Sequence, residues 1–483
     1  MAEQFPGRLL DLLEAAADRP VFEHGDRAVT GRQLLGAVRR VTRGLRDRGV
    51  GPGDGVALLL GVGPEAFAAV VAAHTVGARV VGVRPGLTEQ QRGHLLADTA
   101  FTVTDGPGTD AGPGQVLALD DLLSAPDDGL RPTVAARGRD IARLIHTSGS
   151  TGVPKACAQT YAAMTAAWAL RPDAWPPAVR ELAARLDRFL VFGTLASQVM
   201  MDYGLLTLAA GGTLVTAERP GFPDSIVRHR ATASVITVAR LTKLVRSQRK
   251  EPADLGSLRA LMVSGSPLEP GRLREAAEVL GPVVFHGYGQ TETGMISMAI
   301  PGDVPGSLGV PPVGLEVRDD SGRPVPPGTD GEVFARTAAQ AEGYWREPAL
   351  SAEVFVDGWV RTRDLGRLDA QGRLWLTGRA RDVIIVNANV YYAGPVERLL
   401  ATHPSVAEAY VVAAPDDDTG EAVHAFVVPT AGHVPDLTEL RALVTAELEE
   451  ACAPTRLTVI EEVPVTPAGK PDKRQLAARA GSC

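Results

Sequence analysis

The stretch Leu144-Ile-His-Thr-Ser-Gly-Ser-Thr-Gly-Val-Pro-Lys155 decides the fold. The largely apolar run from Ile141 to Ile145 predicts the end of a buried strand. That strand opens into a loop that carries hydroxyl groups, glycines and a lysine. Glycines let backbone N–H groups approach a polyanion, hydroxyls donate to phosphate oxygens, and lysine adds positive charge. The loop is therefore predicted to bind phosphate, with a Ser/Gly-rich surface turn as the alternative.

The loop is not the P-loop of nucleoside triphosphatases, because Gly149 is not followed at the right spacing by Gly-Lys-Ser/Thr. It resembles the phosphate loop of the adenylate-forming superfamily, which includes acyl-CoA synthetases, nonribosomal-peptide adenylation domains and firefly luciferase. The superfamily pattern ends in Pro-Lys-Gly, and Ala156 here replaces the last glycine. The resemblance implies nucleotide contacts from Thr147, Ser148, Gly149, Ser150, Thr151, Gly152 and Lys155.

Composition narrows the class of protein. The 483 residues are 45% hydrophobic and 22% charged, which is typical of a globular chain with length for about three domains. A net charge of −8 gives no indication of a surface that binds nucleic acid or an anionic membrane. Cys157, Cys452 and Cys483 form no CxxC pair, which argues against disulfides or a thiolate zinc site and favours a reducing compartment. With no signal peptide at the start and no membrane span in 58–80, we expect a cytoplasmic protein.

Strands alternate with helices along most of the chain. Strands are expected at 56–60, 78–83, 189–193, 213–216, 234–238, 258–263 and 283–285, with helices such as 64–75 and 200–210 between them. This alternation predicts parallel βαβ units in sheets covered on both faces. A helix over 159–170 is expected after the phosphate loop, and 105–139 is expected to be a surface connection.

Two further changes of pattern set the domain prediction. Short, turn-punctuated strands between 306 and 376 predict a β-rich subdomain, and the elements from 382 onward predict a small α+β domain. The fold is thus predicted to be α/β, with a large N-terminal domain over 1–380 and a mobile C-terminal domain over 381–483.

A second motif, His286-Gly-Tyr-Gly-Gln-Thr-Glu-Thr-Gly294, is expected just after the strand at 283–285. A tyrosine between glycines can lay its ring on a nucleobase, and a glutamate is a hard ligand for Mg²⁺; a loop with a packed tyrosine is the alternative. The motif matches the superfamily's Tyr-Gly-x-Thr-Glu. The resemblance implies that Tyr288 stacks on adenine, Thr291 contacts phosphate and Glu292 holds Mg²⁺. It also implies nucleotide contacts from His286, Gly287, Gly289, Gly265, Ser266 and Pro267.

The segments 358–367 and 378–382 resemble the superfamily's ribose and hinge elements. Asp364 is placed on the ribose hydroxyls, because a carboxylate can accept two hydrogen bonds there. The family usually reads Thr-Gly-Asp, so Arg363 is a departure, interpreted as a solvated arginine or as functional. Arg379 is implied to reach the ribose or the α-phosphate, and Arg381 occupies the hinge position where Asp or Lys is usual.

The segment Val465-Thr-Pro-Ala-Gly-Lys470 matches Pro-x-Thr-x-x-Gly-Lys. A lysine on such a turn is by itself usually just solvated. The resemblance implies that Lys470 swings into the site and bridges the carboxylate and the α-phosphate, completing a catalytic set with Thr291 and Glu292. Because these motifs occur in the correct order over nearly the whole chain, it is identified as a member of the superfamily, although a fold alone does not fix a function.

The resemblance implies that ATP and Mg²⁺ activate a carboxylic acid as an acyl adenylate with release of pyrophosphate. The acyl group then passes to a thiol, either of coenzyme A or of the phosphopantetheine of an acyl or peptidyl carrier protein. A small or aromatic acid from secondary metabolism is expected, since no gating histidine stands near Ala196. The segment Ile385-Val-Asn-Ala-Asn389 replaces glycines that would let a pantetheine arm pass. The change is either neutral drift or a sign that the acceptor is not coenzyme A, with an amine or nitrite as the alternative acceptor.

The acid pocket is expected to draw on Gln198, Asp202, Arg240, Ser264, Gly294 and Met295. Asp202 either reads a substrate amine or is solvated at a helix start. Arg240 either pairs with a second anion of the substrate or acceptor, or has no such role. A hypothesis of another class is a homologue that binds ATP or a partner without turnover. The retained charges of the motifs argue against it, because charges are costly to bury without a use.

Overall fold

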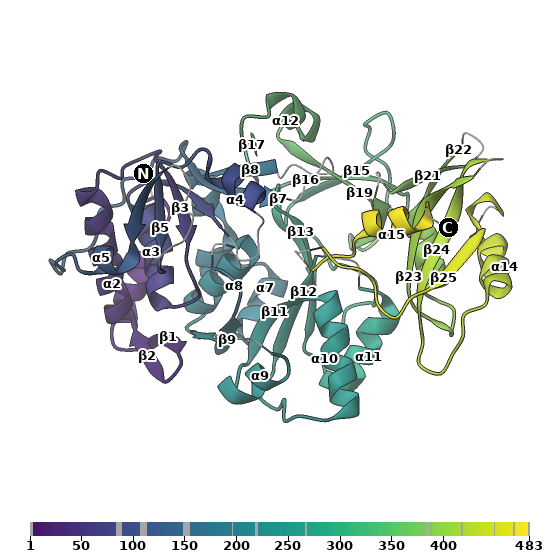
Figure 1. Ribbon diagram of the computed structural model, residues 1–483, viewed down its shortest axis with the longest axis horizontal. Coiled ribbons are helices and arrows are strands. Elements are labelled where there is room, and N and C mark those ends of the chain that lie inside the picture. The colour runs from purple at the N-terminus through teal and green to yellow at the C-terminus, as the bar shows by residue number, and fades with distance from the viewer. Residues whose placement is uncertain are drawn as a thin grey trace.

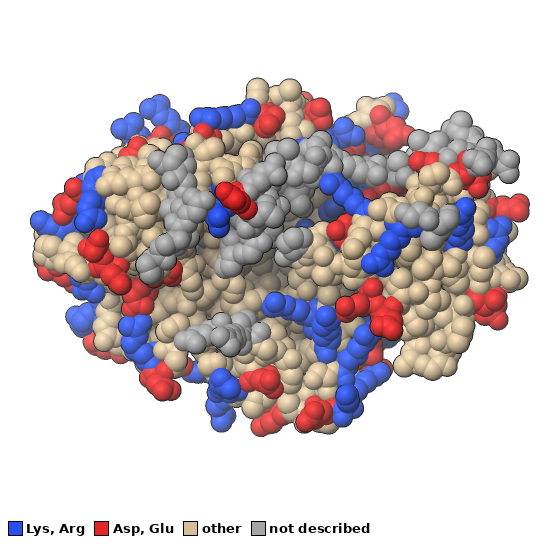
Figure 2. Space-filling view, viewed as in Figure 1, with Lys and Arg blue, Asp and Glu red and all other residues tan. Residues whose placement is uncertain are grey.

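The computed structural model describes residues 3–83, 89–106, 114–147, 155–195, 197–217, 221–265, 268–379, 382–386, 389–416, 419–448, 450–466 and 469–481. The molecule is elongated, with the C-terminal sheet at one end (Figure 1). No helix in these ranges is long and apolar enough to cross a membrane. Basic and acidic side chains are interspersed over the face seen in Figure 2.

The first sheet lies in the middle of the molecule and has the strand order β14-β13-β12-β11-β9-β10-β1-β2. Its strands are β1 Pro20–His24, β2 Arg27–Thr30, β9 Arg188–Val191, β10 Thr213–Thr216, β11 Ala233–Thr237, β12 Ala260–Ser264, β13 Val284–Gln290 and β14 Gly294–Ala299. The strands between β13 and β1 in this order pair in parallel, and the edge strands β2 and β14 are antiparallel. The buried runs 189–191 and 260–263 are the uninterrupted apolar segments that parallel strands covered on both faces require.

The second sheet has the order β17-β8-β7-β4-β3-β5-β6. Its strands are β3 Gly55–Leu59, β4 Arg79–Gly82, β5 Phe101–Thr104, β6 Gln115–Ala118, β7 Ile141–Thr147, β8 Lys155–Thr160 and β17 Gly343–Tyr344. From β6 to β7 the pairs are parallel, whereas β8 is antiparallel to both of its neighbours. Thr147 stands opposite Lys155, so the predicted phosphate loop connects two paired strands.

Helices cover the sheets and fill the space between them. They are α1 Gly7–Ala15, α2 Gly31–Asp47, α3 Pro64–Thr75, α4 Glu89–Leu96, α5 Leu119–Leu123, α6 Tyr161–Ala166, α7 Pro177–Ala183, α8 Gln198–Ala209, α9 Asp224–His229, α10 Val238–Lys250, α11 Pro270–Leu280, α12 Pro348–Val354, α13 Ala393–Leu400, α14 Leu437–Glu447 and α15 Lys473–Ala480. Nearly every residue of α3 is buried, and α3 and α8 contribute to the same core cluster. α2 begins with a capping box between Thr30 and Gln33, which satisfies its first free N–H groups.

Two smaller sheets follow in the chain. The first contains β15 Gly314–Arg318, β16 Gly331–Arg336, β18 Phe355–Val356, β19 Trp359–Leu368 and β20 Leu374–Arg379. The second contains β21 Val383–Val386, β22 Asn389–Tyr392, β23 Val406–Asp416, β24 Gly420–Pro429 and β25 Arg456–Val459, and it packs around its own buried cluster. The β-rich segment and the α/β class agree with the sequence predictions.

The structure corrects three of the predicted elements. Residues 155–160 form β8, so the helix expected over 159–170 begins only at Tyr161. The expected surface connection over 105–139 contains β6 and α5, which add an edge strand and a helix. The second motif does not follow its strand, because His286 to Gln290 are part of β13 and continue the pairing with β14.

Candidate active site

The ends of β7 and β8 flank the predicted phosphate loop. Several predicted site residues lie outside the described part of the chain: Ser148, Gly149, Ser150, Thr151, Gly152, Ser266, Pro267, Arg381, Asn387 and Ala388. For Thr147 only the backbone is described. The Lys155 ammonium lies 5.6 Å from the centre of the Tyr344 ring, where the negative face of the ring favours a cation. The antiparallel pairing of β8 and β17 produces this contact by placing Tyr344 opposite Cys157.

A buried carboxylate, Asp364 on β19, gathers the nucleotide motifs together. The Tyr288 hydroxyl and the Gln290 amide each donate to its Oδ2 at 2.7 Å, and Arg379 Nε donates to its Oδ1 at 2.9 Å. Its side chain is only 5% exposed, so these donors replace water as its hydrogen-bonding partners. The structure thus brings together three predicted residues, Tyr288, Asp364 and Arg379. It adds Gln290, which the sequence analysis passed over although it lies inside the motif.

A second carboxylate, Glu292, lies in the turn between β13 and β14. Its Oε1 accepts a hydrogen bond of 2.7 Å from the Tyr344 hydroxyl. Burial and the Glu292 charge both raise the pKa of Tyr344, so the phenol stays a donor. Burial, with Glu292 contributing, also raises the pKa of the neighbouring Cys157 thiol. Tyr344 was not predicted; the only signal for it was an aromatic residue in the short strand that pairs with β8.

Lys470 reaches this cluster from the C-terminal segment. Its Cε lies 3.5 Å from where a Cβ on Gly265 would be, at the carboxyl end of β12. Burial lowers the pKa of the Lys470 ammonium, and Arg379 adds to that effect, while Glu292 and Asp364 raise it. Gly265 has a φ of +94°, a backbone conformation that favours glycine. In Figure 1 the segment after β25 runs back to the ends of β12 and β13.

Salt bridges anchor α15, which follows Lys470. Lys473 bonds Asp382 at 2.7 Å and Glu397 at 2.8 Å, so the helix is tied to the start of the C-terminal sheet and to α13. α13 also packs closely against β20. A Cβ on Gly394 would come within 2.7 Å of the Gly378 Cα, which leaves no room for a side chain at position 394. Arg398 on α13 donates to the Thr377 carbonyl of β20.

Arg363 is not a freely solvated arginine. Its φ is +61°, in the left-handed region where glycine is the natural residue, which is a physical reason for a glycine at this position of the motif. Its side chain is 20% exposed, and its guanidinium lies 2.9 Å from the Glu353 carboxylate.

The predicted acid-pocket residues come from several elements. A Cβ on Gly294 would lie 3.9 Å from Gln198 Nε2 and 3.7 Å from the Ala339 Cβ. Arg240 is exposed on α10, with its guanidinium 4.6 Å from the centre of the Phe192 ring. Ser264 ends β12, and Met295 packs against the main core cluster.

Asp202 is not solvated at a helix start, since it lies inside α8 and faces a charged partner. Its Oδ1 is 3.6 Å from Arg143 Nη2, and the two side chains are 21% and 9% exposed. Arg143 Nε donates to the Gln159 Oε1 at 2.6 Å, and the Gln159 amide donates to the Ala339 carbonyl at 2.5 Å. Burial lowers the pKa of Arg143 and raises that of Asp202, each being opposed by the other's charge. Arg143 was missed because it was read as part of an apolar strand.

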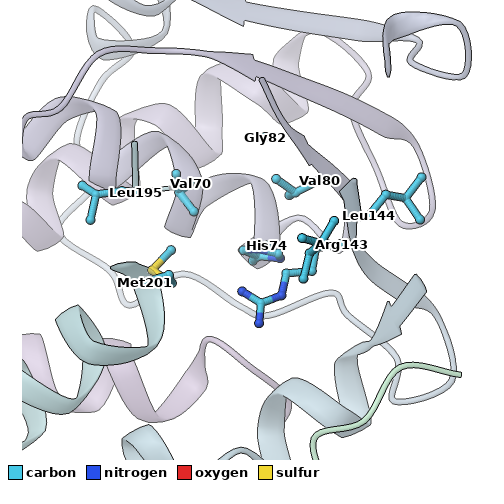
Figure 3. Close-up of a pocket in the computed structure, with 9 residues that line it drawn as sticks. Val70, His74, Val80, Gly82, Arg143, Leu144, Leu195 and Met201 are labelled. Carbon is cyan, nitrogen blue, oxygen red and sulfur yellow. The ribbon is translucent and has the colours of Figure 1, made fainter. Parts of the chain in front are cut away.

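A cavity of about 20 Å³ lies beside Arg143, between α3, β7 and α8 (Figure 3). His74, Val70, Leu195 and Met201 are among its lining residues. This volume accommodates about one water molecule.

The sequence matches two protein families and is similar to several known proteins over most of its length. Residues 12–345 match the family described as AMP-binding enzyme, and residues 395–470 match the AMP-binding enzyme C-terminal domain. A fatty acid–[acyl-carrier-protein] ligase, ScoC of Streptomyces coeruleorubidus, is 30% identical over 94% of this chain and 92% of its own. A feruloyl-CoA synthase of an Amycolatopsis species is 32% identical over 95% of each chain.

Among solved structures, the amide bond synthetase McbA from Marinactinospora thermotolerans is similar with a TM-score of 0.84. It is 32% identical, and the similarity covers 98% of this chain and 99% of that one. The chain therefore belongs to the AMP-binding enzymes of the adenylate-forming superfamily and is an ATP-dependent, AMP-forming ligase.

Proposed function

We propose that this ligase activates a small carboxylic acid and passes its acyl group to a nucleophile. In the first step a carboxylate oxygen of the acid attacks the α-phosphorus of ATP. A new O–P bond forms, the bond from that phosphorus to the β-phosphate oxygen breaks, and pyrophosphate leaves. The observation that carries the proposal is the position of Lys470, a cation delivered by the C-terminal segment to the same place as Glu292, Asp364 and Arg379.

Asp364 is proposed to hold the ribose. A carboxylate offers about four acceptor positions, and Tyr288, Gln290 and Arg379 use three of those on Asp364. The remaining position on Oδ1 can accept one ribose hydroxyl. Arg379, whose side chain is 59% exposed, has guanidinium donors left for the α-phosphate or a second ribose oxygen. Tyr288 is fixed by its hydroxyl, which leaves its ring to lie against adenine.

Glu292 suits a Mg²⁺ ion bound with ATP. In the described part of the chain no three His, Cys, Asp or Glu side chains converge, so most ligands would be phosphate oxygens and water, as is usual for Mg²⁺. The Tyr344 hydroxyl orients the Glu292 carboxylate by donating to Oε1, which leaves Oε2 for the ion. Such an ion would neutralise phosphate charge, and Thr291, next to Glu292, is proposed to donate to a phosphate oxygen.

Lys470 is proposed to neutralise the charge that develops on the α-phosphoryl oxygens and to hold the attacking carboxylate beside them. Placing two anions in line is the main obstacle to this reaction, and positioned positive charge overcomes it.

In the second step a nucleophile attacks the acyl carbon of the adenylate and AMP leaves. A thiol of coenzyme A or of a carrier protein is our first candidate, because the relatives named above include a CoA synthase and an acyl-carrier-protein ligase. An amine is the second candidate. The similarity of the whole chain to an amide bond synthetase favours it, as does the absence of glycines in 385–389.

The proposal is tested by carboxylate-dependent ATP–pyrophosphate exchange over a panel of aryl, amino and short aliphatic acids. Lys470→Ala should abolish most of the exchange, whereas Lys250→Ala, which removes an exposed lysine at the end of α10, should leave it unchanged. Exchange that needs no acid, or that is the same in both variants, contradicts the proposal. With the active acid identified, coenzyme A, a carrier protein and a series of amines are then compared as acceptors.

A further inference from the structure

We infer that the Arg143–Asp202 pair forms the closed end of the acid pocket, and that Asp202 accepts a hydrogen bond from an N–H or O–H group of the substrate acid. This inference rests on the proposed function, because it assigns the pocket to an acid that is adenylated at Lys470. It selects one chemical class: short acids that carry a donor at the end remote from the carboxylate.

Helix α8 places Asp202 in line with the pocket. Gln198 and Asp202 are four residues apart, so they share one face of the helix at a spacing of about 6 Å. Gln198 lies against Gly294, and the Tyr203 hydroxyl lies 3.7 Å from where a Cβ on Gly287 would be. The helix therefore runs along the strands that carry the nucleotide motif, and Asp202 lies one turn further from Gly294 than Gln198 does.

A second chain of contacts leads to the same place. Ala339 lies against Gly294, its carbonyl accepts from Gln159, and Gln159 accepts from Arg143. The pair and the motif are thus joined through α8 on one side and through β8 on the other. The proposed acid pocket extends from Gly294 at one end to Arg143 and Asp202 at the other.

Asp202 has acceptor capacity to spare. Within the described residues its one ion-pair partner is Arg143, at 3.6 Å, whereas Asp364 receives three hydrogen bonds of 2.7–2.9 Å. The side chain is 21% exposed, on a helix whose neighbouring residues Met201 and Tyr203 are buried, so the protein does not fully enclose it. A substrate that fills this space with hydrocarbon would leave the acceptor unpaired, and a substrate with a donor would satisfy it.

The cavity beside Arg143 is small. It measures about 20 Å³ and is lined mostly by apolar side chains (Figure 3). It has room for a water molecule but not for an acyl chain. A long-chain fatty acid would therefore have to displace the ion pair, whereas a one-ring or two-ring acid ends at it.

The test measures kcat/KM for acid-dependent exchange with pairs of acids that differ in one group: 3- and 4-aminobenzoate against 3- and 4-methylbenzoate, and indole- against naphthalene-carboxylates. We expect the donor-bearing member of at least one pair to be preferred about 10- to 100-fold, the discrimination typical of a hydrogen bond to a charged acceptor. In the double variant Arg143→Met/Asp202→Leu the preference should disappear or reverse. The matched control Arg259→Met/Asp187→Leu removes an exposed pair of the same type and should keep it.

A preference that is absent in the parent enzyme, or unchanged in the double variant, overturns this inference and leaves the proposed function standing, because exchange still occurs. Failure of every acid to support exchange overturns both. Asp202→Asn provides a second reading if the double variant does not fold, since it keeps the shape and removes the charge. It should reduce the preference for the donor-bearing acid, whereas exchange with the methyl-substituted acid stays measurable, unlike in Lys470→Ala.

Discussion

The candidate site has a nucleotide end, around Asp364 and Lys470, and an acid end, around Arg143 and Asp202. The charged side chains at the two ends come from different parts of the fold. At the nucleotide end, Asp364 is bonded by side chains from β13 and β20, and Lys470 arrives from beyond the C-terminal sheet. At the acid end, Arg143 and Asp202 come from β7 and α8, within the main core. The acid end is thus fixed when the large α/β part folds, whereas the nucleotide end is complete only when the C-terminal segment is in place.

Polar contacts help to hold the C-terminal part in this position. Arg272 bonds Glu408 at 2.9 Å, and the exposed Lys243 lies 3.4 Å from Glu462. Exposed ion pairs contribute about 0–1 kcal/mol each. The Lys243–Glu462 pair is therefore weak, whereas the Arg272–Glu408 pair, with side chains 13% and 20% exposed, is largely shielded from water.

The largest effect is expected for Lys470→Ala. The variant should lower acid-dependent exchange about 10²–10³-fold, roughly 3–4 kcal/mol in barrier, because a positioned charge is lost. Its thermal unfolding midpoint should stay the same, since burial lowers the pKa of Lys470 and its charge is not a source of stability. If the variant lost stability together with activity, the loss of exchange could be caused by unfolding, and a specific effect of the Lys470 charge on the rate would be contradicted.

Arg143→Met tests the acid end. The variant should lose about 3 kcal/mol of unfolding free energy, the low end for a broken buried pair because Asp202 keeps some exposure. Urea denaturation measures the change. Arg259→Met, in a surface pair with Asp187, should lose less than about 1 kcal/mol. Equal losses of unfolding free energy in the two variants would mean that the Arg143–Asp202 pair stabilises the fold no more than an exposed ion pair does.

The pH dependence of stability should report His74, which lies beside the cavity at the acid end. Burial lowers the pKa of His74 from 6.5 to about 3, with Arg143 contributing. Between these values the unfolded chain binds a proton that the folded chain does not, so stability falls as the pH falls, by up to about 1.4 kcal/mol per pH unit. Denaturation of His74→Gln between pH 4 and 6 should show a shallower dependence, and His433→Gln, at an exposed site, should match the parent. Identical slopes in all three would contradict the assignment.

The smallest effect is expected at Arg363. Because its φ is +61°, Arg363→Gly should be more stable than Arg363→Ala by about 1 kcal/mol, despite the greater flexibility of glycine in the unfolded chain. Both variants lose the pair with Glu353, so their difference isolates the backbone. Differential scanning calorimetry can resolve this difference. An alanine variant as stable as the glycine variant would remove strain as the explanation.

The sequence predicted the parallel strands and α3 because buried apolar runs with helical or strand spacing have few other interpretations. It failed at β8, where Ala156-Cys-Ala-Gln159 has no β-branched residue and only pairing with β7 and β17 makes a strand. Tyr288, Asp364 and Arg379, which the structure brings into contact, were named from the sequence because each lies in a short motif. Arg143, Gln159 and Tyr344 were not, since each acts through a partner that is distant in the chain and adjacent only after folding.

The Arg143–Asp202 pair also constrains how the enzyme can evolve. A lineage that moves toward apolar acids has to remove both charges, and whichever is lost first leaves the other buried and unpaired. The intermediate is less stable than either the ancestor or the final form, so the two substitutions are strongly epistatic. Relatives that lack one of the two residues are therefore expected to lack the other, and to differ from this chain in the acids they accept.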